Sequence, residues 1–134
     1  MKALNLFLND IYGEQNIIRD GIIPAKLIAT CPHFLKEVVG IKVPHDIYIH
    51  ISGIDLIRGA DGVFYMLKDN LRTPSGVSYM LENREVTKRI FAEMLANNRV
   101  RMINSYPLEL TSILAALSPK QVEQPHVVLL TPGT

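Results

Sequence analysis

Residues 47–68 restrict the fold most, because they have the pattern of two strands joined by a tight turn. Isoleucine occupies every second position of residues 47–51, and a period of two is typical of a half-buried strand. Asp61-Gly62 then forms the dipeptide that most strongly favours a type I′ turn, and a strand is expected over 63–68 after it. We therefore predict a β-hairpin over 47–68.

Apolar residues at helical spacing predict helices on both sides of this hairpin. The first is expected to end at Gly13. The fold class is thus α+β, with a mixed or antiparallel sheet flanked by helices. The expected helices cover residues 2–12, 25–29, 34–39, 84–96 and 107–117, and a final strand is expected over 126–130.

The length of 134 residues suits a single domain. Within it we distinguish a helical scaffold, a segment with the hairpin and its polar loop, and a closing segment of helices and the final strand. These three parts are residues 1–43, 44–84 and 85–134.

Composition and charge exclude several functions. With 14 Lys+Arg against 13 Asp+Glu and dispersed basic residues, the chain lacks the charge pattern of a nucleic-acid binder. Apolar runs are too short to span a membrane, and Asn5 and Asn9 interrupt the N-terminus before a signal-peptide core forms. We expect a cytoplasmic protein.

The single cysteine, Cys31, excludes a Cys-rich zinc site, and we interpret it as a buried apolar residue.

Polar residues are concentrated at the end of the hairpin away from the turn. If Asp61 and Gly62 are the whole loop, Asp55 lies opposite Lys68, and Asn70 follows on the same face. A longer loop would shift this register. Asp55 and Asn70 carry the oxygen ligands that Mg²⁺ prefers. The alternative is a solvated face with an Asp55–Lys68 ion pair worth about 0.2–1 kcal/mol.

The loop over residues 69–76 has two interpretations as well. Arg72, Thr73, Ser75 and the amides near Gly76 can cradle a phosphate, or they form an ordinary turn.

Several segments together resemble the circularly permuted ATP-grasp family, and the resemblance covers nearly the whole chain in order. The DNLRTPSGVSY stretch is the most specific of them. The segments are NLFLNDIY at residues 5–12, GIDL at 53–56, DNLRTPSGVSY at 69–79, LENR at 81–84 and VVLLTPG at 127–133.

The resemblance implies a MgATP site between two α+β lobes, where a carboxylate is activated as an acyl phosphate that an amine then attacks. Family members hold the metals with an Asp and a Glu-x-Asn motif, which match Asp55 and Asn70, whereas the Glu position falls on Lys68. An ammonium offers no lone pair and repels a cation. Either metal-dependent catalysis is lost or Asp69 takes the vacant role, and we favour the loss.

The loop after the metal motif also matches the family, which implies that it contacts phosphate or substrate. On this basis Arg72 and Ser75 are the candidate catalytic residues, and Arg72, Thr73, Ser75 and Gly76 the candidate nucleotide-binding residues. The matching residues 82–84 have a second interpretation, with Asn83 at a helix start and its neighbours on the surface.

Family members are several times longer, so the resemblance implies a partial ATP-grasp domain that lacks the lobe gripping adenine. We expect little or no turnover from this chain alone. Its expected partners are the missing lobe or a second copy, with small carboxylate and amine substrates in the complete enzyme. The alternative function is a non-catalytic domain that binds a partner or dimerises through apolar surface.

Overall fold

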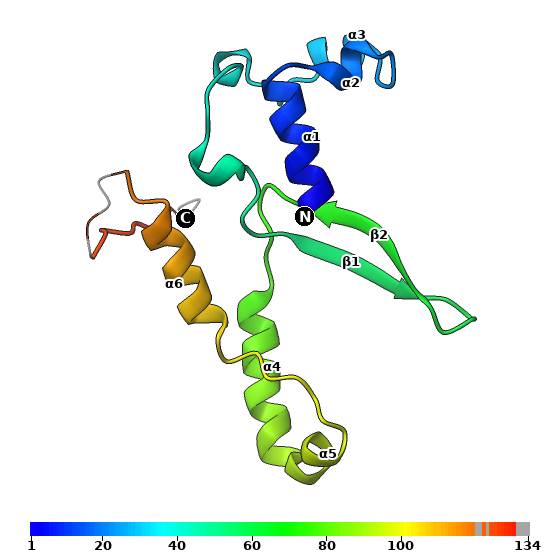
Figure 1. The fold of residues 1–134 in the computed structure, drawn as a ribbon. Helices are drawn as coiled ribbons and strands as arrows, with labels where there is room; N and C mark the ends of the chain where they lie inside the picture. Colours follow the sequence, from blue (N-terminus) through cyan, green and yellow to red (C-terminus); the bar gives the residue numbers. More distant parts are fainter. Residues whose placement is uncertain (120–121, 123, 131–134) are drawn as a thin grey trace. The chain divides into compact units, whose positions relative to one another are not determined.

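The computed structural model describes residues 1–119, 122 and 124–130. The chain divides into two compact units, Met1–Pro74 and Ser75–Thr134. Six α-helices and one antiparallel two-stranded sheet occur in the described residues. Figure 1 labels these elements along the chain. The predicted α+β class is therefore confirmed.

The first unit begins with helix α1, Lys2–Tyr12, which confirms the helix expected over residues 2–12. Apolar residues recur on one side of it, and Ile11 is only 2% exposed. The helix ends at Gly13, whose amide donates to the Asp10 carbonyl at 3.1 Å.

Short helical pieces follow α1 in the first unit. Helix α3 matches the prediction for residues 25–29, but the helix expected over 34–39 is reduced to a 3-10 turn because Leu35 and Val39 are extended. Cys31 is exposed, so its interpretation as a buried residue was wrong. The pieces are α2, Asn16–Arg19, α3, Ala25–Ala29, and two 3-10 turns, η1, Lys36–Val38, and η2, Pro44–Asp46.

The strand predicted from residue 47 begins only at Gly53. The reason is a side chain of α1. The Oδ1 atom of Asn5 accepts the amides of Tyr48 and Ile49, each at 2.8 Å, and its Nδ2 atom donates to the Ile49 carbonyl at 3.1 Å. Because Asn5 already satisfies these backbone groups, they need no neighbouring strand.

Strands β1, Gly53–Arg58, and β2, Phe64–Asn70, form the hairpin, drawn in green in Figure 1. The predicted two-residue turn is wrong. The Gly59 amide donates to the Val63 carbonyl at 2.8 Å, so the loop holds three residues, 60–62. Gly62 takes the left-handed conformation, with φ +79°, that such a loop requires.

An irregularity in β2 cancels the effect of the longer loop. Leu56 lies opposite Met66, but Asp55 lies opposite Lys68, so Leu67 is an extra residue with no partner on β1. The expected pairing of Asp55 with Lys68 is therefore present although the loop is longer than predicted.

The second unit contains three α-helices in its described residues. They are α4, Val77–Ile90, α5, Ala92–Asn97, and α6, Tyr106–Ala116. Helix α6 confirms the prediction over 107–117 within one residue. The single helix expected over 84–96 instead starts seven residues earlier, after Gly76, and breaks at Phe91, whose ψ of +40° is not helical.

Residues 126–130, expected to form a final strand, are irregular and unpaired within the described chain. Their side chains have little cover, and Leu130 is 92% exposed. The prediction of a strand over 126–130 was therefore wrong for these residues, and the end of the VVLLTPG match lies outside the described residues.

Burial is sparse. Ile11 and Ile49 are the buried apolar residues among those described, at 2% and 7% exposure. Apolar side chains of the hairpin are open to solvent, including Phe64 at 66% and Leu67 at 65%. No helix of the described residues is long and apolar enough to cross a membrane.

Candidate functional site

Asp55 and Lys68 form the centre of the candidate site. They are direct cross-strand partners, and the Lys68 Nζ atom lies 3.3 Å from the Asp55 Oδ2 atom, as the sequence predicted. Both side chains are largely exposed, at 55% for Asp55 and 72% for Lys68. Water therefore weakens their attraction, and the pair contributes about 0–1 kcal/mol.

Asn70 lies on the same face of the hairpin as Asp55. It is opposite Gly53, two residues beyond Lys68, and no irregularity separates these pairs. Its Nδ2 atom donates to the Thr73 carbonyl at 3.1 Å, and its Oδ1 atom has no hydrogen-bond donor among the described residues. Asn70 thus keeps the oxygen that a cation would use.

Asp69 lies on the opposite face. Its cross-strand partner is Ile54, and successive residues of a strand point to opposite sides of the sheet. The register therefore groups Asp55, Lys68 and Asn70 and leaves Asp69 apart. No group of three or more His, Cys, Asp or Glu residues that could hold a metal occurs in the part of the chain that the structure describes.

The loop residues fall on either side of the boundary between the units. Arg72 and Thr73 belong to the first unit, where both are exposed and the Thr73 carbonyl anchors Asn70. Ser75 and Gly76 begin the second unit, directly before α4. Gly76 has φ +90°, a conformation that glycine adopts at no steric cost.

The N-terminus of α4 has the features of an anion site. The helix is 14 residues long, no side chain caps it, and its first turn holds no acidic residue. Amides of a first helical turn lack partners within the helix and favour negative charge. Ser75 and Gly76 are thus next to donors that suit a phosphate.

Residues 82–84 lie within α4, so the interpretation of Asn83 as a helix-start residue is wrong. The Asn83 carbonyl accepts from the Thr87 hydroxyl at 2.6 Å. The Arg84 Nη1 atom donates to the Arg101 carbonyl at 2.7 Å, which ties α4 to the segment before α6. In the next turn, the hydrogen bond from Lys88 holds the pKa of Glu85 below its usual range.

A second polar group lies at the turn of the hairpin. The Tyr65 hydroxyl donates to the Asp61 Oδ2 atom at 2.6 Å, and the Val63 amide donates to Oδ1 at 3.0 Å. These bonds lower the pKa of Asp61, and the bond to Asp61 raises the pKa of Tyr65. Their effect is to order the turn.

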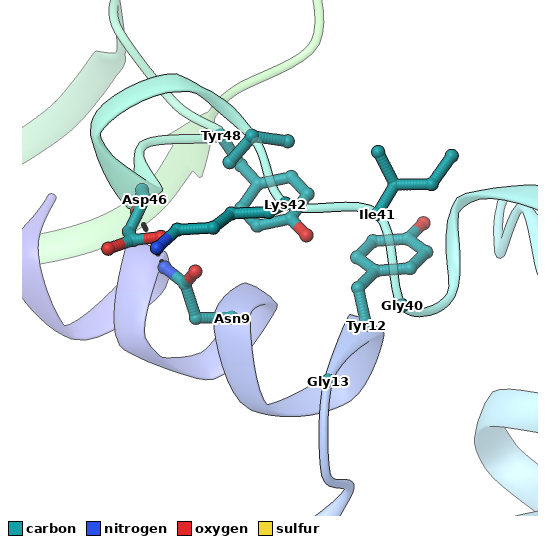
Figure 2. Close-up of a pocket in the computed structure, with 9 residues that line it drawn as sticks. Asn9, Tyr12, Gly13, Gly40, Ile41, Lys42, Asp46 and Tyr48 are labelled. Atoms are coloured by element: carbon teal, nitrogen blue, oxygen red, sulfur yellow. Dashed lines mark hydrogen bonds between the residues drawn. The ribbon is translucent and has the colours of Figure 1, made fainter.

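Sequence reasoning missed a pocket in the first unit, between α1 and residues 40–48. Figure 2 shows Lys42, Asp46 and two tyrosines around it. The two sides of the pocket lie far apart in sequence and form no motif. The Asn5 and Asn9 contacts fold residues 46–49 against α1, and the Gly40 amide, which donates to the Tyr12 carbonyl at 2.7 Å, holds the start of the second segment there.

Comparison with known proteins gives one consistent result. The model of a family described as a circularly permuted ATP-grasp matches residues 1–134. An uncharacterized protein of Mycobacterium leprae is 48% identical over 133 residues, which are 99% of this chain and 24% of that protein. An uncharacterized protein of Synechocystis is 47% identical over 99% of this chain and 28% of its own length.

A third relative has a name that describes an activity. A protein of Frankia casuarinae, provisionally named a glutamate–cysteine ligase, is 36% identical over 136 residues, 99% of this chain and 15% of that protein. The chain thus spans about a quarter of the length of the first two relatives. Because the family model matches along all 134 residues, the chain belongs to the circularly permuted ATP-grasp family.

Proposed function

We propose that this chain provides metal- and phosphate-contacting residues of an ATP-dependent ligase that joins a carboxylate to an amine. The observation that carries the proposal is the position of Asp55 and Asn70 on one face of the hairpin, in a chain that belongs to the ATP-grasp family. The Frankia relative supports the reaction class, since its name describes a glutamate–cysteine ligase, and joining two amino acids in this way links a carboxylate to an amine.

The donor set suits Mg²⁺ only in part. Asp55 and Asn70 offer two hard oxygen ligands, and phosphate oxygens of ATP would complete the coordination. Mg²⁺ bound there would neutralise charge on the phosphates. However, Asp69 is on the other face, and the ammonium of Lys68 lies 3.3 Å from the Asp55 carboxylate. We therefore infer that this chain alone binds metal weakly.

The loop residues are proposed to contact phosphate and substrate. Arg72 provides a guanidinium and Thr73 a hydroxyl, and Ser75 and Gly76 precede the amides of α4. In the reaction, a carboxylate oxygen attacks the terminal phosphorus of ATP and ADP leaves. The amine then attacks the acyl carbon, phosphate leaves and the nitrogen loses a proton. Arg72 and Ser75 remain the proposed catalytic residues.

The exposed hairpin supports the proposal that more polypeptide is needed for turnover. Met66, at 62% exposure, Phe64 and Leu67 present apolar surface to water, and such surface commonly marks an interface. We propose that further ATP-grasp polypeptide covers it, and that this chain alone is inactive. Since the reaction consumes ATP, we place the protein in the cytoplasm.

Reverting Lys68 to the family's acidic residue tests the metal site. Lys68→Glu removes the ammonium beside Asp55 and adds an oxygen ligand on the same face. We expect the affinity for Mn²⁺ to rise by about tenfold or more, because affinity follows the number of charged ligands. Line broadening of the Asn70 side-chain amide by Mn²⁺, followed by NMR, measures both the affinity and the place of binding.

The matched control is Lys36→Glu, an exposed lysine outside the hairpin with the same change in charge. It should leave the Mn²⁺ titration unchanged. Adding Asp55→Asn to Lys68→Glu should remove the gain. An equal response of Lys36→Glu and Lys68→Glu, or a gain that survives Asp55→Asn, would contradict the proposed site.

A further inference from the structure

We propose that the pocket between α1 and residues 40–48 binds a free amino acid with an apolar side chain. The pocket has a volume of about 200 Å³ and lies wholly within the first unit. Its position is separate from the hairpin residues discussed above, so the inference does not depend on the proposed ligase function.

One end of the pocket is aromatic. The rings of Tyr12 and Tyr48 are nearly parallel, at 19°, with their centroids 5.4 Å apart. Phe34 also stacks on Tyr12, with the centroids 5.1 Å apart, and this second stack restrains the Tyr12 ring. Ile41 extends the apolar wall, as Figure 2 shows. This end suits an aliphatic or aromatic side chain.

The other end is polar and carries both signs of charge. In Figure 2 the Lys42 side chain extends toward Asp46 and Asn9. Neither Lys42 nor Asp46 has an ion-pair partner within 4 Å among the described residues, whose salt bridges lie elsewhere. An ammonium and a carboxylate that do not pair with each other can each bind the opposite charge of one ligand.

The backbone that presents Asp46 is held in an unusual conformation. His45 and Asp46 have φ +57° and +55°, in the left-handed region that is unfavourable for most residues other than glycine. The Asn9 Nδ2 atom donates to the Asp46 carbonyl at 2.6 Å and thereby fixes this turn against α1. The carboxylate is thus attached to a rigid part of the pocket wall.

These features select one class of ligand. The Asp46 carboxylate disfavours a phosphate or any other anion that lacks a positive group, and Lys42 disfavours a simple amine. A molecule with a carboxylate and an ammonium next to each other satisfies both residues. The aromatic end then accepts the remainder of the molecule, and the volume is sufficient for an amino acid of the size of leucine.

Titration of the full chain with L-leucine tests the inference, with the amide signals of Gly13 and Gly40 in the pocket wall followed by NMR. Saturable shifts with a Kd on the order of 1 mM are expected for so small a ligand in an open pocket. Isocaproate lacks the ammonium of leucine and isoamylamine lacks the carboxylate. Each should bind at least tenfold more weakly.

Two variants test whether the charges of Lys42 and Asp46 contribute to ligand binding. Lys42→Met keeps the apolar stem of the side chain, and Asp46→Asn removes the charge but keeps a side chain that tolerates φ +55°. Each should weaken L-leucine binding at least tenfold, whereas Lys36→Met and Asp20→Asn, outside the pocket, should leave it unchanged. Absence of saturable shifts in the unmodified chain, or equal binding of isoamylamine and L-leucine, would overturn the inference without bearing on the proposed ligase function.

Discussion

The Asn5 side chain makes the hydrogen bonds to the backbone of residues 48 and 49 that a neighbouring strand would make in a sheet. One amide side chain accepts two backbone N–H groups and donates to one carbonyl. Asn9, one helical turn later, adds a bond to the Asp46 carbonyl. In the sequence both asparagines were interpreted only as interruptions of a signal-peptide core, yet they connect α1 to the rest of the first unit.

Replacing Asn5 should therefore cost more than an ordinary surface substitution. Asn5→Ala leaves three part-buried backbone groups without their partner, and we expect a loss of about 1–3 kcal/mol in the free energy of unfolding. Urea denaturation measures it. Asn97→Ala, at an exposed asparagine in α5 that makes no side-chain hydrogen bond among the described residues, is the control. Equal stability of the two variants would show that the Asn5 contacts contribute nothing.

Asp10 should make the first unit sensitive to acid. Its carboxylate accepts the amides of Ile17 and Asn16, each at 2.9 Å, and the Ile17 bond is the largest cause of a pKa below the ordinary 3.8. With the folded pKa below the unfolded one, the stabilisation is complete above the unfolded pKa and is lost as the pH falls through the folded pKa.

We thus expect the urea midpoint of the unmodified chain to fall below about pH 4, and to fall less steeply in Asp10→Asn. Asp20→Asn is the control, because the Asp20 side chain makes no hydrogen bond among the described residues. A pH profile that Asp10→Asn leaves unchanged would argue against this role of the carboxylate.

Among the elements, those defined by local patterns were predicted well. Helix α1 and helix α6 follow from apolar periodicity, and the hairpin follows from its turn residues. Errors occurred where a distant contact or the backbone conformation of a single residue decides. The strand predicted over 47–52 is replaced by bonds to Asn5, and the start of α4 depends on Gly76 in a conformation that periodicity does not reveal.

The candidate site was predictable only in part, because some of its features follow from local patterns and others do not. The Asp55–Lys68 contact was predicted correctly from a wrong turn, because the longer loop and the extra Leu67 compensate each other. Strand alternation puts Asp69 on the opposite face, and the expectation that Asp69 could take the vacant role did not use this pattern. In contrast, the pocket with Lys42 and Asp46 exists only through packing between segments far apart in sequence, which no local pattern contains.

Gly62 controls the hairpin turn. A Cβ atom at this position would meet nothing closer than 3.5 Å, so a substitution there costs conformational energy and creates no clash. We expect Gly62→Ala to lower stability by about 1 kcal/mol, because φ of +79° is unfavourable for alanine. Gly62→Asn should cost less, since Asn adopts this conformation more readily.

Nuclear Overhauser contacts between Ile57 and Tyr65, which are cross-strand partners, report whether the hairpin forms in each variant. They should be weaker in Gly62→Ala than in Gly62→Asn. The reverse order would show that the conformation of Gly62 is not what limits the turn.

At the scale of the whole molecule, stability should depend on very few apolar residues. Ile11 is 2% exposed and Met66 is 62% exposed. We expect Ile11→Ala to cost about 2–5 kcal/mol and Met66→Thr to stay within about 0.5 kcal/mol, because only the first loses buried contacts. Denaturation at low and high protein concentration measures both.

The Met66→Thr variant also tests which polypeptide covers the exposed apolar side chains of the hairpin, further ATP-grasp polypeptide or a second copy of this chain. If further ATP-grasp polypeptide is the natural cover, Met66→Thr should be neutral at every concentration of this chain. A loss of stability in Met66→Thr that grows with concentration would instead assign the cover to a second copy of the chain, because dimer stability follows mass action.

The extra residue at position 67 has a consequence for how this hairpin can change in length. Deleting Leu67 would give an uninterrupted ladder in which Asp55 still faces Lys68, and shortening the loop at Ala60 would leave every pair beyond Gly59 in place. Loss or gain of one residue at either point therefore leaves Asp55 opposite Lys68. Single-residue insertions and deletions in the hairpins of related proteins should be concentrated at these two points.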